Sequence, residues 1–178
     1  MTIAVIVAIA ATLALVIVAL VTNRQWFVLP AVAVVAVVIV LSLALPFRAE
    51  GAWLSIAVAI GLAGLGVLGG SPIVGLVLRF AQGGVELGDH GGIVVDDSRT
   101  TRKEILRGGA TIGILERLAL IGAVVAGQAA AIAIIVAVKG LGRFSELDDS
   151  QARERFIIGT LTSLIWAGAC AAAIMLAA

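Results

Sequence analysis

Long apolar runs, separated by short polar segments, dominate this 178-residue chain. Residues 3–21 are interrupted only by Thr12, and residues 26–45 form a second run after a short polar turn. A third run begins near Trp53, and a last one covers residues 153–175. Apolar runs of about 18 or more residues are typical of membrane-spanning helices. The pattern predicts an all-α, polytopic transmembrane helical bundle that forms a single domain over residues 1–178.

Small residues mark two of these runs as packing surfaces. In the third run, Gly66 and Gly70 have the GxxxG spacing that allows another helix to approach closely. We expect Gly70-Ser71-Pro72 to bend or break this helix, so that residues 73–80 either complete the crossing at an angle or lie along the interface. The last run carries a ridge of small residues at a spacing of four: Gly159, Ser163, Ala167 and Ala171.

Residues 82–107 are the largest polar segment, and we predict that they form a cytoplasmic loop within the domain. Residues 85–87 and 93–95 flank a turn-rich string and could pair as a small hairpin. Thr101 to Glu104 has the pattern of a capping box and predicts a short helix that continues through Arg107. Imidazole and carboxylates are suitable metal ligands, but without a closely spaced set we expect a solvated turn and no metal at Asp89, His90, Asp96 and Asp97.

The composition strengthens the membrane interpretation and excludes several classes of function. Hydrophobic residues make up 62% of the chain and charged residues 13%, with a mean hydropathy of +1.21, whereas soluble domains carry about 25% charged residues. The basic residues are mixed with acids and lack interleaved aromatic residues, so nucleic acid is not indicated as a partner. No Walker loop, zinc-protease or nucleophile-elbow motif occurs. We therefore expect no catalytic residues and no cofactor.

The number of helices depends on residues 110–138. As one helix they would be roughly 43 Å long, well over the ~30 Å hydrocarbon core, whereas two helices that turn at Gly127-Gln128 fit. With five helices the basic residues divide about evenly between the two sides, but with six only Arg48 lies opposite the rest. Because cytoplasmic loops carry an excess of Lys and Arg, we predict six helices with both termini outside, and keep five as the alternative. The grouped residues are Arg24, Arg79, Arg99, Arg102, Lys103, Arg107, Lys139, Arg143, Arg153 and Arg155.

An antiparallel hairpin with this turn brings Glu116 and Lys139 to the same depth. A carboxylate inside the membrane is costly and usually finds a partner, so we predict an intramembrane ion pair between these two residues. Arg117 points about 100° away from Glu116 on the same helix, and we expect it to reach the headgroups or another helix. Three roles remain open: fixing the helix register, a proton or ion path through Glu116, and an anion or headgroup site built from Arg107, Arg117, Lys139 and Arg143.

Three segments carry a resemblance to a known family: GGATIGILERLALIG, GQAAAIAIIVAVKGLGRFSEL and ERFIIGTLTSLIWA. Over about residues 108–166, the chain resembles the second half of an uncharacterised bacterial integral-membrane protein family, a domain of unknown function. Residues 1–107 do not match the family's usual amino-terminal pattern. The resemblance implies a protein of the bacterial plasma membrane and supplies no activity.

These observations favour a small integral membrane protein without catalysis of its own, acting as an accessory subunit or as a binder of lipid headgroups. The expected partners are membrane lipids, including anionic headgroups, and a protein partner or a second copy of the chain is compatible with the sequence. The first alternative is an ion or small-solute carrier or channel that uses Glu116 and Lys139. The second is a membrane enzyme that acts on lipid-linked phosphate.

Overall fold

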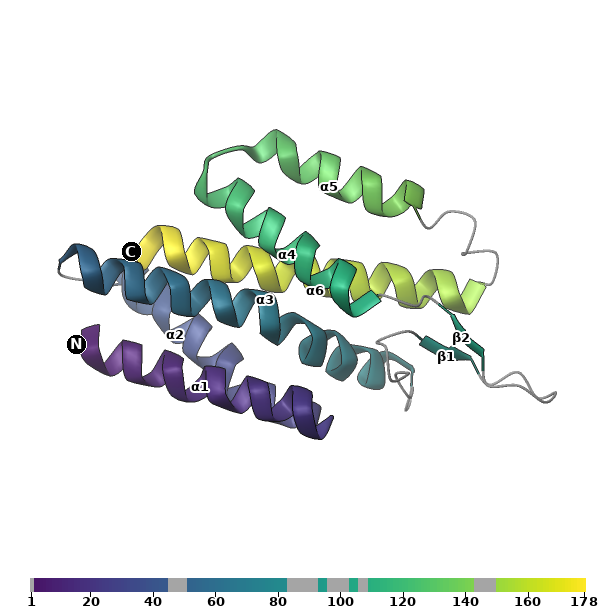
Figure 1. Cartoon of the computed structure of the whole chain (residues 1–178), viewed down its shortest axis with the longest axis horizontal. Helices are drawn as coiled ribbons and strands as arrows, with labels where there is room; N and C mark the ends of the chain where they lie inside the picture. The colour runs from purple at the N-terminus through teal and green to yellow at the C-terminus, as the bar shows by residue number, and fades with distance from the viewer. Residues whose placement is uncertain (1, 45–50, 83–92, 96–102, 106–108, 143–149) are drawn as a thin grey trace.

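The described part of the chain contains six α-helices, and they confirm the predicted all-α bundle (Figure 1). The computed structural model describes residues 2–44, 51–82, 93–95, 103–105, 109–142 and 150–178. A 3-10 helix, η1, leads into α2, and two short strands, β1 and β2, lie between α3 and α4. The helices are α1 (Thr2–Thr22), η1 (Gln25–Val28), α2 (Leu29–Ala44), α3 (Ala52–Gln82), α4 (Gly109–Val125), α5 (Ala129–Gly142) and α6 (Ser150–Ala177).

Four of these segments are long and apolar enough to cross a membrane, which makes the chain a helical membrane protein. These segments are α1, α3, α6 and the stretch that η1 and α2 form together. Large apolar side chains cover the outside of the bundle, among them Ile3, Val40 and Ile60, which are more than half exposed. Such a surface is unsuited to water, but it matches lipid, where the backbone hydrogen bonds of a helix must be satisfied internally.

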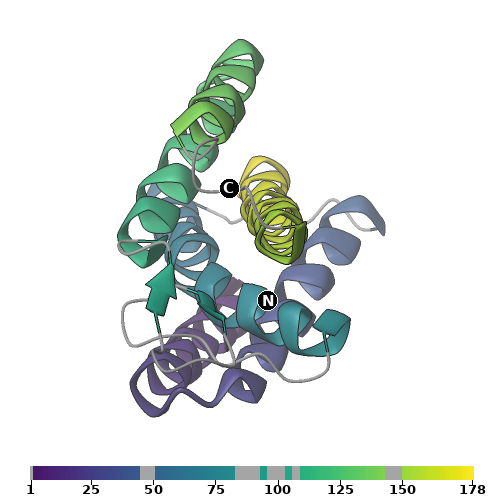
Figure 2. The ribbon, with the colours of Figure 1, turned by 90° about the vertical axis from the view of Figure 1, so that its right-hand side faces the viewer.

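Helix α3 is the centre of the bundle, because α1, α4 and α6 all pack against it (Figure 2). Its glycines lie where neighbouring side chains come closest: a methyl group on Gly61 would meet Ile9 of α1, and one on Gly66 would lie 2.7 Å from Cδ1 of Ile121 in α4. The GxxxG spacing is therefore used for close packing. The predicted ridge of α6 also faces inward, since Ala167 is fully buried.

Of the two outcomes expected at Gly70-Ser71-Pro72, a bend or a break, the break does not occur: α3 continues through Pro72 to Gln82 and includes residues 73–80. A proline inside a helix removes one donor and loosens the preceding turn. In this protein, one side chain from another helix reaches that turn: Arg117 of α4 donates to the carbonyl of Val67 and to Ser71 Oγ. A neighbouring helix thus supports the weakened stretch, as happens for prolines in membrane helices.

The short strands differ from the sequence prediction. β1 (Ile93–Val95) pairs antiparallel with β2 (Lys103–Ile105), with Val94 opposite Glu104. The predicted helix through residues 101–107 is therefore wrong at residues 103–105, and the predicted partner strand, residues 85–87, lies outside the described residues. A helix of two turns is marginal on its own, and pairing with the β-branched segment 93–95 is the better alternative.

The hairpin of α4 and α5 confirms the predicted turn and excludes a single rod over residues 110–138. Gly127 has φ +69°, and the chain closes the helix with bonds from Gln128 N to Ala123 O and from Gly127 N to Val124 O. This pattern is a Schellman motif, in which glycine takes the left-handed conformation without a Cβ penalty. The amino end of α1 and the carboxyl end of α6 lie at the same end of the bundle (Figure 1), as six helices require.

Candidate functional site

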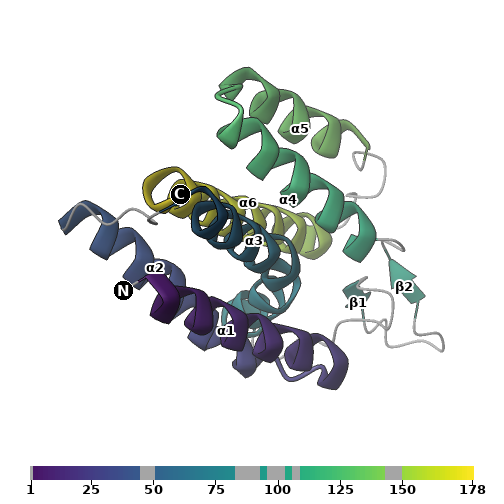
Figure 3. The same ribbon diagram turned by 60° about the vertical axis from the view of Figure 1, so that its left-hand side comes forward.

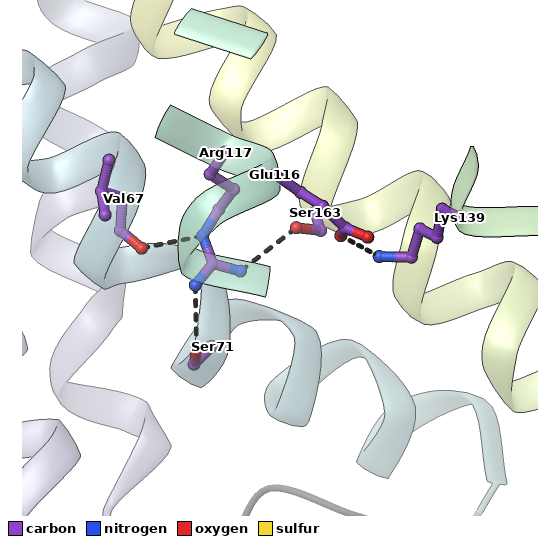
Figure 4. Close-up of polar contacts among 6 residues, drawn as sticks. All are labelled: Val67, Ser71, Glu116, Arg117, Lys139 and Ser163. Carbon is purple, nitrogen blue, oxygen red and sulfur yellow. Dashed lines mark hydrogen bonds and ion pairs between the residues drawn. The ribbon is translucent and has the colours of Figure 1, made fainter. Parts of the chain in front are cut away.

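The hairpin carries three charged side chains at one level: Glu116 and Arg117 on α4 and Lys139 on α5 (Figure 4). Adjacent residues on a helix project in directions about 100° apart, and here the two neighbours separate. Glu116 points toward α5, whereas Arg117 points toward α3 and α6 (Figure 4). The hairpin therefore presents one ion pair on one side and one guanidinium on the other.

Glu116 and Lys139 form the predicted contact, in which Lys139 Nζ donates to Glu116 Oε2. Their side chains are 12% and 15% exposed, so the pair is largely shielded from its surroundings. Lys139 Nζ also lies 6.0 Å from the centre of the Phe156 ring of α6, at the outer limit of a cation–π contact. The pair joins the two arms of the hairpin and brings the end of α5 close to α6.

Arg117 is 3% exposed and connects three helices. Its Nε donates to the Val67 carbonyl at 2.7 Å, and its terminal nitrogens donate to Ser71 Oγ at 3.1 Å and Ser163 Oγ at 3.2 Å. A buried cation without hydrogen-bond partners is very unfavourable, and these neutral acceptors supply three partners. We expected Arg117 to reach either the headgroups or another helix, and in the structure it contacts two other helices, α3 and α6.

Two glycines make room for the Arg117 side chain. A methyl group on Gly70 would lie 2.5 Å from Arg117 Nε and 2.7 Å from Cζ, and one on Gly113 would lie 3.1 Å from a terminal nitrogen. Such distances are shorter than van der Waals contact. The sequence indicated Gly70 only as part of a GxxxG spacing and did not identify what approaches it.

Trp166 of α6 makes a second polar contact to α3 that sequence reasoning missed. Its Nε1 donates to the Leu65 carbonyl at 3.0 Å, and the ring packs over Gly69. A buried indole N–H usually finds such an acceptor. Together, Arg117 and Trp166 bind two carbonyls of α3 that are two residues apart, from two different helices.

The proposed anion site of four cations is only partly represented in the structure. Arg107 and Arg143 lie outside the described residues. Arg117 and Lys139 face different neighbours, so these two cations do not point into a common space (Figure 4). Asp89, His90, Asp96 and Asp97 also lie outside the described residues, and within those described no group of three or more His, Cys, Asp or Glu lies together.

The charges of the described residues gather toward one end of the bundle. Arg24 follows α1, Arg79 lies in the last turn of α3, and Arg153 and Arg155 lie in the first turns of α6. No Asp, Glu, Lys or Arg occurs among the described residues of three long segments, 25–78, 118–138 and 156–178. Trp26 and Phe80 also pack together at this end, edge to face at 5.7 Å. A basic rim next to aromatic rings is typical of a membrane–water interface.

Comparisons with family models, with curated proteins and with solved structures find no match to this chain. The resemblance over residues 108–166 therefore stays a prediction.

Proposed function

We propose that the chain is a non-catalytic integral membrane protein that binds anionic lipid headgroups at the basic end of its bundle. In this proposal, it resides in the bacterial plasma membrane with the basic end in the cytoplasm and both termini outside. The observation that carries the proposal is the one-sided placement of the described cations at helix ends, beside the pair of Trp26 and Phe80. Each Lys or Arg near an anionic surface contributes about 1 kcal/mol to membrane attraction.

The intramembrane charges support a binding or accessory role over transport. Glu116 is paired with Lys139, and Arg117 is bound to α3 and α6. Charges used in this way hold helices together. A carrier would have to break the pair in each cycle, and the Arg117 contacts would resist relative movement of α3, α4 and α6.

Lipid retention in native mass spectrometry tests the proposal. The protein is reconstituted in nanodiscs of mixed phosphatidylglycerol and phosphatidylcholine, and the lipids that remain bound after gentle release are identified. We expect selective retention of phosphatidylglycerol. The exposed Arg24 and Arg79 are changed together to Gln, which should weaken retention on the order of tenfold or more. The matched control changes both to Lys, keeps the charge and should keep the lipid.

Three outcomes would overturn the headgroup proposal. Equal retention of both lipids would remove the basis for anion selectivity. A retained protein chain without lipid would instead identify an accessory subunit. Ion or solute flux in liposomes that disappears in Glu116→Gln would identify a carrier.

A further inference from the structure

Arg24 and Arg79 come to one place in the bundle from the ends of two different helices. Gly61 and Gly64 of α3 face successive turns of α1, so the two helices run side by side in the same direction (Figures 1 and 3). Arg24 follows the end of α1, and Arg79 lies in the last turn of α3. Because the helices are parallel, both cations lie at the basic end of the bundle.

A pair of aromatic rings joins these two helix ends. Trp26 of η1 meets Phe80 of α3 edge to face, with the ring centroids 5.7 Å apart. Arg24 is two residues from Trp26, which limits the distance between their Cα atoms to about 7 Å, and Arg79 is adjacent to Phe80. Both rings are more than half exposed, as is typical of aromatic residues at the level of the headgroups. We refer to Arg24, Gln25, Trp26, Arg79 and Phe80 as the η1 corner.

The cations of the η1 corner have no acidic side chain beside them in the described parts of α1, η1, α2 and α3. Arg24 and Arg79 are the only charged side chains among those residues. In contrast, the basic residues at the start of α6 flank Glu154, and Lys139 is paired with Glu116. Guanidinium groups bind phosphate oxygens through charge-assisted hydrogen bonds that are often bidentate. Two guanidinium groups without a carboxylate of their own favour phosphate as a ligand.

Gln25 adds an acceptor that has no donor. Its side chain is 3% exposed, and its Oε1 is buried without a hydrogen-bond partner among the described residues. A buried polar atom without a partner is costly, and in a native structure it indicates a partner from outside the chain. The neighbouring side chains of Arg24 and Trp26 are exposed, and exposed side chains change rotamer within nanoseconds. They can therefore move aside and let a donor reach Gln25.

We propose that the η1 corner binds a phospholipid with a phosphodiester and a hydroxyl-bearing headgroup. The phosphate accepts hydrogen bonds from Arg24 and Arg79, and a headgroup hydroxyl donates to Gln25 Oε1. The rings of Trp26 and Phe80 lie beside the glycerol backbone of the lipid. An ammonium headgroup would also donate, but it would add a third positive charge next to two guanidinium groups. This inference rests on the proposed headgroup binding and adds the group that selects among anionic lipids.

Competition between two anionic lipids tests the contact with the hydroxyl. Nanodiscs contain equal amounts of phosphatidylglycerol and phosphatidylethanol in phosphatidylcholine, with the same acyl chains, and native mass spectrometry measures which lipid the protein retains. Both anionic lipids have one negatively charged phosphodiester, but only phosphatidylglycerol has hydroxyls in its headgroup. One additional hydrogen bond corresponds to a preference of about twofold to tenfold for phosphatidylglycerol.

Gln25→Leu removes the acceptor and should make the retention of the two anionic lipids equal. Retention of both above phosphatidylcholine should persist, because Arg24 and Arg79 remain. The substitution should not impair folding, since leucine leaves no buried polar atom without a partner, and Gln25→Met repeats the test if Gln25→Leu does not fold. The matched control is Gln128→Leu, which removes an exposed amide at the opposite end of the bundle and should keep the preference.

The outcomes separate this inference from headgroup binding itself. Equal retention of phosphatidylglycerol and phosphatidylethanol by the wild-type protein, with both above phosphatidylcholine, overturns the hydroxyl contact and leaves headgroup binding intact. A preference that survives in Gln25→Leu overturns the role of Gln25 as the acceptor. If soluble glycerophosphoglycerol displaces the bound lipid as readily as phosphatidylglycerol vesicles do, the ligand is a free phosphodiester and the lipid assignment is wrong. Equal retention of all three lipids removes headgroup binding, and this inference with it.

Discussion

The Gly70→Ala substitution tests whether Arg117 holds α3, α4 and α6 together. The added methyl group would lie 2.7 Å from Arg117 Cζ, well inside van der Waals contact. Gly70 lies within α3, where the backbone is held on both sides by helical bonds. The Arg117 side chain must therefore move, and movement breaks its bonds to Val67, Ser71 and Ser163.

The magnitude follows from the number of bonds lost. An interhelical hydrogen bond in a membrane protein contributes about 0.6 kcal/mol on average and up to about 1.7 kcal/mol, so three bonds amount to about 2–5 kcal/mol. Replacing glycine by alanine inside a helix returns up to about 1 kcal/mol. We expect Gly70→Ala to lower the free energy of unfolding by about 1–4 kcal/mol.

Reversible unfolding in mixed detergent micelles measures this free energy. The matched control is Gly64→Ala in the same helix, where the methyl group would lie 3.6 Å from Cδ1 of Leu13 in ordinary contact. Gly64→Ala should be neutral or stabilising. In an Arg117→Ala background the steric conflict is absent, so adding Gly70→Ala should cost nothing more. The reasoning fails if Gly70→Ala is as stable as Gly64→Ala, or if its cost is the same with and without Arg117.

Two further predictions use other contacts of the bundle. Reversing the charge of either Glu116 or Lys139 leaves two like charges together and should lower the free energy of unfolding by about 3–5 kcal/mol. Reversing both charges should recover most of the stability and the expression level. No recovery in the double variant would show that the two charges act separately. Trp166→Phe removes the hydrogen bond to the Leu65 carbonyl and should lower the free energy of unfolding by about 1 kcal/mol. The control, Trp53→Phe at an exposed position, should change this free energy little. Equal effects of the two substitutions would count against the Trp166 bond.

The hairpin and its ion pair could be predicted because both depend on rules that act along the chain. Helix length and the distribution of Lys and Arg placed the turn at Gly127-Gln128, and the helical repeat brought Glu116 level with Lys139. No knowledge of the neighbouring helices was needed. Geometry within one supersecondary unit was sufficient.

The partners of Arg117 could not be predicted in the same way, because they lie on two helices that are distant in the sequence. Val67 is 50 residues away and Ser163 is 46, and their approach depends on how α3 and α6 pack. The only local indication was a pair of serines, Ser71 and Ser163, within apolar helices. The sequence left open whether α3 bends or breaks at Pro72 for the same reason, because the Arg117 contacts near that proline come from another helix.

The same charge rule that identified the hairpin cannot decide how deeply it inserts. A hairpin that crosses the bilayer twice and one that enters and leaves a single leaflet both return the chain to the side from which it came. Arg79 and Arg153 therefore share one side in either case, and the distribution of basic residues is unchanged. Depth has to come from the register along α3: the turn lies level with Ile60, and the distance along the helix from Ile60 to Arg79 is about 28 Å, close to the whole hydrocarbon core of about 30 Å. Because this distance is the same whichever side of the membrane the basic end faces, the sidedness of the protein and the depth of its hairpin are separate questions.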